Sequence, residues 1–400
     1  MCYPLQVKRT KLSVPQNYVS NLERLLGLEL SHEALISKKG RKALEPFVQG
    51  VSALSSGLTK EKHELIQRKY LREDDIRNAY LLYYTTTNFL KVIQPINEWL
   101  PYFKGDTFRI LDLGCGTGAA AWGLLHYLST HEHSIKKVEI TFADYIRENL
   151  DICKNLFALQ EVEFEILADY HQIDIKDDRV VKKVFGEAKY DLVLMMNTLN
   201  ELPEEGDAER INTFTSLLSD DGALLIIEPA SKSESRRLLS FRDTAVWKKV
   251  TVYSPCTHQM NCPALIKADD WCFNEVQWER PEFIRYIDDE VGNVRLSLKY
   301  SYIILTKNGT TLHRNLGLPA ASRIVSEVFA EKGRTRALIC DGEGRGEHIL
   351  NKRDKSLNNK VFIDTERFDL LTLSLAEKRE HDTRILESST VSIVLPILGA

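Results

Sequence analysis

A glycine-rich loop between a buried strand and a helix is the feature that most restricts the fold of this chain. The apolar run at 109–114 predicts a strand, and the pattern at 117–129 predicts a helix. The loop that joins them contains four regularly spaced residues, Asp112, Gly114, Gly116 and Gly118. Glycines allow a ligand to approach the backbone closely, and the helix N-terminus offers free N–H groups. The arrangement predicts an α/β domain that binds a nucleotide-like ligand at this loop.

Short apolar runs and longer amphipathic segments alternate after residue 108. The apolar runs predict five strands, at 109–114, 138–144, 162–169, 190–199 and 222–230. Strands separated by helices form βαβ units, so we expect a parallel sheet covered on both faces. Two later strands, at 296–307 and 335–344, are predicted to be antiparallel. Residues 15–100 are predicted to form three or four helices, the last of them at 74–99.

The spacing of the loop points to a particular ligand. The dinucleotide fingerprint is G-x-G-x-x-G, whereas this loop reads D-x-G-x-G-x-G and resembles the first motif of class I S-adenosylmethionine (SAM) methyltransferases. Asp144 is predicted to end the second strand, where it would accept hydrogen bonds from the ribose hydroxyls, or serve only as a helix N-cap. Asp169 is predicted to end the third strand, near the adenine amino group.

Polar residues follow the fourth predicted strand. Asn197, Asn200 and Glu201 are expected to face the pocket, and Asn197 is also counted among the cofactor-binding residues. The [DNS]-P-P-[YF] motif of amino-methylating enzymes is absent from this place. The three residues are therefore weak catalytic candidates, with capping or support of the loop as the alternative. Cys115, within the glycine loop, is expected to be small and buried.

Three of the seven cysteines lie within seventeen positions, and a fourth lies on a later predicted strand. These are Cys256, Cys262, Cys272 and Cys340. Four thiolates can hold a tetrahedral zinc ion or an iron–sulfur cluster. The spacing differs from the C-x₂-C of zinc knuckles, which favours an iron–sulfur cluster or an unusual zinc site. His258 is an alternative zinc ligand in place of Cys340, and a loop of buried cysteines without a metal is the remaining alternative.

Charge is distributed unevenly along the chain. The net charge of the 400 residues is −4, yet residues 1–72 contain 13 Lys and Arg against 6 Asp and Glu. Residues 323–360 contain nine basic residues against six acidic ones. Such patches indicate an anionic partner or solvated surfaces. No apolar run approaches the roughly 20 residues that span a bilayer, so no membrane partner is expected.

Several segments together resemble the methyltransferase-like assembly factors of the small ribosomal subunit, or Rsm22-type proteins, of bacteria and mitochondria. The matching segments are VPQNYVSNLERLL, RNAYLLYYTTTNFLKV, ILDLGCGTGAAAW, DLVLMMNTLNEL, LLIIEPA and SPCTHQMNCP…DWCF. The resemblance implies a [4Fe–4S] cluster held by Cys256, Cys262, Cys272 and Cys340, and contact with ribosomal RNA of the immature subunit. The threonines of TTTNFL depart from the arginine-proline pair that is common there.

These observations predict four parts of the chain: an N-terminal helical region (1–100), a methyltransferase-like SAM-binding domain (101–245), a cysteine-cluster segment with closing strands (246–345) and a C-terminal extension (346–400). The predicted function is a factor that binds SAM and a [4Fe–4S] cluster and assists small-subunit assembly through ribosomal RNA. An active SAM-dependent RNA methyltransferase and a zinc-bearing small-molecule methyltransferase are the alternatives. The N-terminus shows no signal or transit pattern, so a bacterial cytoplasmic protein, monomeric off the ribosome, is expected.

Overall fold

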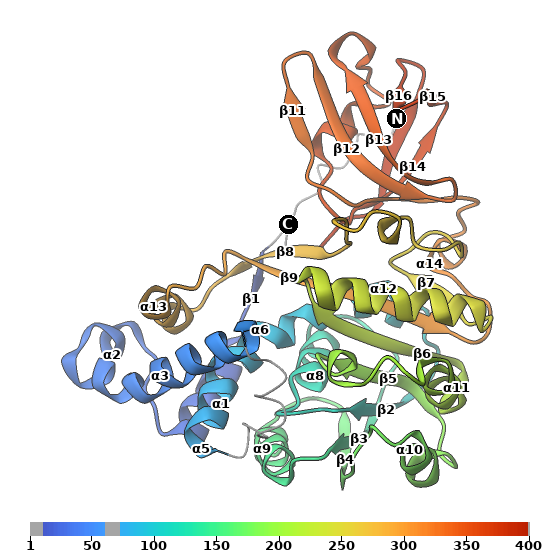
Figure 1. The fold of residues 1–400 in the computed structure, drawn as a ribbon. Helices are drawn as coiled ribbons and strands as arrows, with labels where there is room; N and C mark the ends of the chain where they lie inside the picture. Colours follow the sequence, from blue (N-terminus) through green and yellow to red (C-terminus); the bar gives the residue numbers. More distant parts are fainter. Residues whose placement is uncertain (1–10, 61–72, 399–400) are drawn as a thin grey trace.

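Two β-sheets organise the protein. The computed structural model describes residues 11–60 and 73–398, and the structural statements below refer to these residues. Figure 1 shows the first sheet in the lower part of the molecule, with helices on both faces, and the second sheet, coloured orange to red, above helix α12. The N-terminal helices, in blue, lie beside the first sheet.

Five neighbouring strands of the first sheet are parallel, as predicted. They are β2 (Thr107–Leu113), β3 (Lys137–Asp144), β4 (Glu165–Gln172), β5 (Tyr190–Met196) and β6 (Leu218–Pro229). Their order across the sheet is β4-β3-β2-β5-β6, so the direction of strand addition reverses between β2 and β5. Ligands of open α/β sheets bind at the carboxyl ends of the strands at such a reversal. The glycine loop leaves β2 at this point.

Helices cover both faces of this sheet. They are α8 (Ala119–Thr130), α9 (Arg147–Phe157), α10 (Asp178–Phe185), α11 (Asp207–Ser216) and α12 (Lys232–Trp247). Neighbouring residues of a strand point to opposite faces. Ile110 therefore packs in the core that contains α8, α9 and the N-terminal helices, whereas Leu111 packs in the core that contains α10, α11 and α12. The apolar character of β2 on both faces follows from this double cover.

One antiparallel strand completes the sheet and separates two short strands from β6. This strand, β9 (Ser297–Thr306), pairs antiparallel with β6, with β7 (Thr251–Ser254) and with β8 (Asn274–Glu279). Because β7 pairs with residues 304–306 of β9 and β8 with residues 297–300, the two short strands lie end to end. The segment 255–273, with three of the cysteines, connects them. The class I methyltransferase fold predicted from the glycine loop is confirmed.

The N-terminal region is helical, as predicted, and the short strand β1 (Leu12–Ser13) pairs with β8. Its helices are α1 (Gln16–Leu26), α2 (His32–Ile36), α3 (Lys38–Lys60), α5 (Asp74–Ala79), α6 (Thr86–Phe89) and α7 (Ile93–Trp99). The predicted helix at 74–99 contains a π-helical turn at Tyr80–Thr85 and a 3₁₀ turn at Leu90–Val92. In the described ranges, no helix is both long and apolar enough to cross a membrane.

The second sheet follows two small helices, α13 (Glu282–Val291) and α14 (Leu312–Asn315). Its strands are β10 (Ser322–Ile324), β11 (Phe329–Glu331), β12 (Arg334–Asp341), β13 (Gly344–Asn351), β14 (Leu370–Ser374), β15 (Glu377–Lys378), β16 (Thr383–Ile385) and β17 (Thr390–Leu395). The strand predicted at 335–344 corresponds to β12, which is antiparallel to its neighbours. The expected division between residues 345 and 346 falls inside β13, because this sheet has its own apolar core and continues to residue 395.

Candidate functional site

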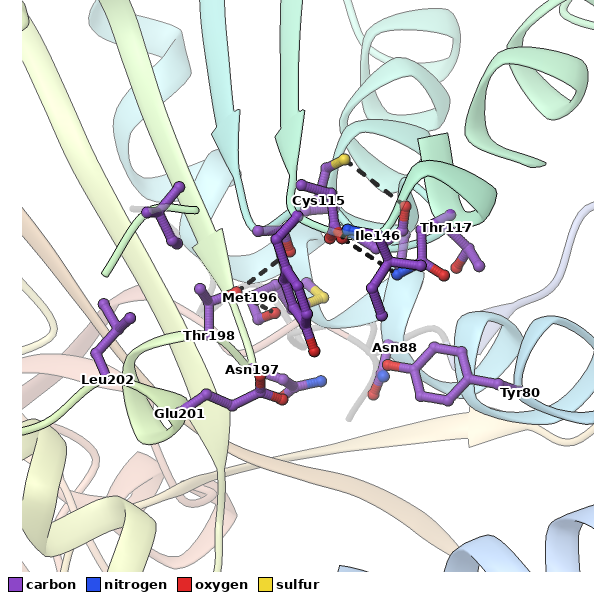
Figure 2. A pocket seen from close by; sticks show the side chains of 18 of the residues that line it. Tyr80, Asn88, Cys115, Thr117, Ile146, Met196, Asn197, Thr198, Glu201 and Leu202 are labelled. Carbon is purple, nitrogen blue, oxygen red and sulfur yellow. Dashed lines mark hydrogen bonds between the residues drawn. The ribbon is translucent and has the colours of Figure 1, made fainter. Parts of the chain in front are cut away.

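The first candidate site is a pocket at the carboxyl ends of β2, β3 and β5 (Figure 2). The glycine loop forms one wall, and the amides of Gly114 and Cys115 donate to the carbonyl of Ala143 at 2.8 and 3.1 Å. Gly114 has a φ of +71°, and a Cβ added there would lie 2.5 Å from the Thr198 side chain. Gly116 has a φ of +53°, and a Cβ added there would point into open space. The loop therefore needs glycine at both positions, for different reasons.

Asp144 ends β3, as predicted, and lines the pocket. Its carboxylate accepts hydrogen bonds from the amides of Gly116 (2.9 Å) and Ile146 (2.8 Å) and from the Asn149 side chain (3.3 Å). Burial raises the pKa of this carboxyl, and the three donors oppose that shift. A carboxylate has about four lone-pair sites, so it retains acceptor capacity for a ligand hydroxyl.

Asp112 and Gly118 lie behind the glycine loop instead of among the residues that line the pocket. Asp112 is 1% exposed, and within the described part of the chain its carboxylate oxygens have no hydrogen-bond partner. Burial and the charge of Asp144 raise the pKa of Asp112 to about 8, so the neutral acid predominates at pH 7. Gly118 packs against Cys153, whose Sγ would lie 2.8 Å from an added Cβ. Both residues are placed to support the loop.

The expected position of Asp169 is wrong. Strand β4 continues to Gln172, so Asp169 lies within the strand and not at its end. Its side chain is 73% exposed and contacts His171 at 2.8 Å. The residues that line the pocket after β4 are Asp174, Ile175 and Lys176. Asp169 was chosen because ligands bind where parallel strands end. Since β4 ends at Gln172, the same reasoning points to Asp174.

The residues after β5 have different orientations. Asn197 and Glu201 line the pocket, as expected, and Asn197 adopts a left-handed φ of +56°, which asparagine tolerates better than most residues. Asn200 instead donates to the buried carboxylate of Glu228. The same carboxylate accepts from the amides of Thr198 and Leu199 at 3.1 and 2.9 Å. Asn200 therefore supports the loop, and the expectation that it faces the pocket is wrong.

Two pocket residues come from the N-terminal helices and were missed by the sequence analysis. Tyr80 begins the π-helical turn and Asn88 lies on α6, and both face Asn197 and Glu201 across the pocket in Figure 2. The hydroxyl of Thr85 contacts that of Thr117 in the glycine loop at 2.6 Å, which joins this helical run to the pocket wall. The threonines of TTTNFL are buried. These polar residues interrupt an apolar run, and that interruption was the one sign in the sequence that this helical segment lies against the pocket.

The second candidate site is a cavity between the two sheets. All four cysteines line it: Cys256 after β7, Cys262, Cys272 before β8, and Cys340 on β12. His258 lines the same cavity, and its Nε2 lies 3.4 Å from Sγ of Cys340. Burial lowers the pKa of His258 to about 4, so its imidazole is neutral. The fold thus brings the four cysteines predicted to be metal ligands, and the alternative ligand His258, to a single cavity.

Side chains from α12, from β9 and from the cysteine segment itself fix the backbone of this cavity. The contacts join Asp243 to the amide of Cys262 (3.0 Å), Ser235 and Ser301 to the carbonyl of Cys272 (2.6 and 2.8 Å), and Thr257 to the carbonyl of Cys340 (3.3 Å). Three of the four cysteines are therefore held at the backbone by hydrogen bonds that do not involve the thiols. Such support is typical of a site whose side chains must be oriented.

The thiols are electrostatically coupled. Burial, followed by the neighbouring cysteines, raises the pKa of Cys262 to about 12 and the pKa of Cys340 well above its usual range. Burial raises the pKa of Cys272 to about 11. Thiols in this state deprotonate only when a cation compensates their charge. As the side chains stand in residues 11–60 and 73–398, no three His, Cys, Asp or Glu residues converge as a metal site.

The family described as mitochondrial small ribosomal subunit Rsm22 matches residues 55–361, well over half of the sequence. The chain belongs to this family. The match includes the glycine loop and all four cysteines of the cavity. The Rsm22 description names mitochondria, a different compartment from the bacterial cytoplasm expected from the N-terminus.

The chain is also similar to parts of other proteins. The highly reducing polyketide synthase GPY1 of Gibberella fujikuroi is 30% identical over 179 residues, which cover 44% of this chain and 7% of that protein. The TehB-like SAM-dependent methyltransferase of Corynebacterium glutamicum is 17% identical, covers 64% of this chain and 98% of its own, and gives a TM-score of 0.32. The putative RNA methyltransferase PH1948 of Pyrococcus horikoshii is 16% identical, with coverages of 56% and 84% and a TM-score of 0.32.

Arg236 of α12 organises the cysteine segment of this Rsm22-family chain. Its guanidinium donates to four carbonyl oxygens, those of Ala264 (3.1 Å), Leu265 (3.3 Å), Lys267 (2.8 Å) and Asp270 (2.7 Å). A hydrogen bond to a charged group makes a net contribution of about 1.5–3 kcal/mol. We therefore expect Arg236 to stabilise the conformation that the segment between Cys262 and Cys272 has in this structure.

Replacing Arg236 by Met keeps the aliphatic stem and removes the donors. The free energy of local opening of residues 263–270 should fall by about 2–3 kcal/mol, because four carbonyls of the segment lose a charged donor. Hydrogen–deuterium exchange of that segment measures the change. Lys232→Met, at an exposed position of the same helix, is the matched control. Equal exchange in the Arg236 and Lys232 variants would show that the segment does not depend on Arg236.

Proposed function

We propose that this protein is an assembly factor of the small ribosomal subunit that binds SAM in the first pocket and a [4Fe–4S] cluster in the cysteine cavity. Membership of the Rsm22 family supports a ribosomal role. The observation that carries the cluster is the meeting of Cys256, Cys262, Cys272 and Cys340 at one cavity, although Cys340 is far from the others in sequence. Four cysteine thiolates are the usual ligands of such a cluster.

The donor set fits this group. The cavity is buried between two sheets, and Cys272 and Cys340 are held at their carbonyls by side chains of neighbouring segments. When bound, a cluster would supply an electron-transfer or structural centre. The protein would exclude water from it and hold it through the four cysteine thiolates. A zinc site that includes His258 is the alternative for the same cavity, and metal analysis distinguishes the two.

SAM binding is supported by the pocket at the switch point of the sheet. Gly114 and Gly116 bring the backbone to the ligand, and Asp144 provides an acceptor at the end of β3. We assign Asp174, in place of Asp169, to the adenine edge. When bound, SAM would supply an electrophilic methyl group.

Methyl transfer to RNA is a second candidate function. Polar side chains from two separate elements, Tyr80 and Asn88 on one side and Asn197 and Glu201 on the other, surround the open part of the pocket. Such groups can orient an acceptor atom. Incubation of the protein with labelled SAM and precursor small subunits tests this candidate, and incorporation that is lost in the Glu201→Gln variant would support it.

RNA binding by the N-terminal region rests on part of the predicted basic patch. Lys38, Lys39, Arg41 and Lys42 are exposed where α3 begins. Residues 1–10 and 61–72, with further basic residues, lie outside the described residues. In the C-terminal patch, Arg334 and Arg336 form ion pairs with Glu331 at 2.7 and 2.6 Å, which offset their charge. In Figure 1, α3 and β11 lie in different parts of the molecule, so we base the RNA interface on α3.

Reversing the four charges of α3 tests this interface. The variant with Lys38, Lys39, Arg41 and Lys42 changed to Glu should bind small-subunit RNA more weakly. The slope of log affinity against log salt should become shallower by up to about 2.8, since each single-strand phosphate contact contributes roughly 0.7. Filter binding across a salt series measures both quantities.

A control with the same change in charge separates a local contact from net charge. Its four sites are exposed lysines on or next to α10 and α12, Lys182, Lys183, Lys232 and Lys248. If both variants keep the affinity and slope of the wild type, α3 does not contact RNA. If both lose affinity equally, the effect belongs to the charge of the whole protein.

A further inference from the structure

Arg323 lies beside Cys340 in the wall of the cysteine cavity. The two residues are direct partners in the antiparallel pairing of β10 and β12, so their side chains leave the sheet on the same face. Both line the cavity. Arg323 is 2% exposed, which is unusual for a residue that carries a permanent charge. Because a buried charge is costly unless it is paired, we expect Arg323 to interact with negatively charged groups.

Three of the five N–H groups of Arg323 have acceptors, and the two on Nη2 have none among the described residues. Its Nε donates to the carbonyl of Pro255 at 3.1 Å, and its Nη1 donates to Glu98 at 3.0 Å and to the carbonyl of Phe368 at 2.8 Å. Its Nη2 is buried and finds no hydrogen-bond partner in residues 11–60 and 73–398. A buried donor without a partner costs about 1–3 kcal/mol, so a ligand that accepts from it would gain affinity.

The surroundings of Arg323 join three parts of the protein at the cavity. Pro255 directly precedes Cys256, and Arg323 pairs with Cys340 across β10 and β12, so Arg323 contacts the backbone beside one cysteine and lies opposite another. Glu98, on α7, also accepts from Tyr302 of β9 at 2.9 Å. Burial opposes the charge of the Arg323 guanidinium, and the neighbouring Glu98 carboxylate outweighs it and keeps the pKa of Arg323 above its usual range. These contacts hold the guanidinium in the cavity wall, and its buried Nη2 has no hydrogen-bond partner in the part of the chain that the structure describes.

We propose that Arg323 is a positioning residue of the metal centre, whose unused Nη2 donates a hydrogen bond to the sulfur of the bound cluster and whose charge compensates its negative ligands. This inference rests on the proposed function, because it requires a cluster in the cavity. A cluster with four thiolates is anionic, and reduction adds a further negative charge. A fixed guanidinium therefore stabilises the reduced state more than the oxidised state and raises the reduction potential.

The test compares the anaerobically purified wild type with three variants: Arg323→Gln alone, Arg323→Gln with Glu98→Gln, and Arg210→Gln. The double variant avoids leaving the Glu98 carboxylate buried and unpaired, which would destabilise the fold. Arg210 is an equally buried arginine that pairs with Asp207 away from the cavity, so its variant is the matched control. The readouts are iron and sulfide content and the reduction potential in a dye-equilibrated titration.

We expect the double variant to remain folded and to have a more negative potential than the wild type. At a fixed potential, its ratio of oxidised to reduced cluster should rise about tenfold, equivalent to 59 mV for one electron. The Arg210 variant should keep the potential of the wild type. An unchanged potential and iron content in both Arg323 variants, with a cluster present in the wild type, would overturn the role of Arg323 alone. A wild type without iron and sulfide would overturn the cluster and this role together.

Discussion

The Cys340→Ser protein should lose nearly all of its iron and sulfide during anaerobic purification. Cys340 is the one proposed ligand on the second sheet, whereas the other three proposed ligands lie in one segment between two strands of the first sheet. Changes that only touch the surroundings of metal ligands cost about 10–100-fold in affinity, so loss of a ligand should weaken cluster retention by more than about 100-fold. Because ligand binding contributes to folding stability, the melting temperature should fall as well.

The same variant should also loosen the second sheet. If the cluster joins Cys340 to the cysteine segment, its loss should speed proteolytic separation of residues 322–395 from the rest of the chain. Cys153→Ser is the control, because Cys153 is a fully buried cysteine of α9 outside the cavity. A Cys340 variant with the full iron content of the wild type would remove Cys340 from the ligand set and make His258 the next candidate.

Asp144→Ala should weaken SAM binding by roughly 10- to 150-fold. The carboxylate contacts the Gly116 amide at 2.9 Å and lines the pocket, so the variant loses both an acceptor for the ligand and a support of the loop. Hydrogen bonds to a charged group contribute about 1.5–3 kcal/mol, and each 1.4 kcal/mol is tenfold in affinity. Isothermal titration calorimetry measures the change directly.

Two further variants distinguish the pocket in the structure from the pocket expected from the sequence. Asp169→Ala should leave the SAM affinity unchanged, because Asp169 is exposed and pairs with His171. Asp174→Ala should lower it, because Asp174 lines the pocket. The reverse order of effects, with Asp169 important and Asp174 neutral, would mean that the adenine edge lies elsewhere. Equal affinity in Asp144→Ala and the wild type would show that SAM does not bind here.

The centre of the first sheet was predictable because its signals are local. A buried strand, a glycine loop and a helix follow one another within about twenty residues, and parallel strands covered on both faces are continuously apolar. Strand β4 is different. It is the edge strand, its residues alternate irregularly between exposed and half-buried, and the apolar pattern could not fix its end. The misplaced Asp169 follows from that three-residue difference.

Contacts between distant segments account for the other differences. Asn200 is turned from the pocket by Glu228, which lies on the neighbouring strand and is almost thirty positions away. Tyr80 reaches the pocket only because the helix that carries it packs on the glycine loop through Thr85. Four strands of the second sheet have only two or three residues, too short to give a reliable pattern, and of its longer strands only β12 was predicted. Cys340 was assigned as a fourth cysteine on a later predicted strand, with His258 as the alternative, and the family resemblance implied the same four cysteines.

Quantitative metal analysis of the anaerobically purified wild type tests the proposed cluster most directly. Iron, acid-labile sulfide and zinc are measured per chain, and Mössbauer spectroscopy identifies the type of cluster. Four iron and four sulfide per chain, with a [4Fe–4S] spectrum and little zinc, is the result that a cluster at Cys256, Cys262, Cys272 and Cys340 predicts. One zinc per chain without sulfide, or no metal in a folded protein supplied with iron, would contradict it.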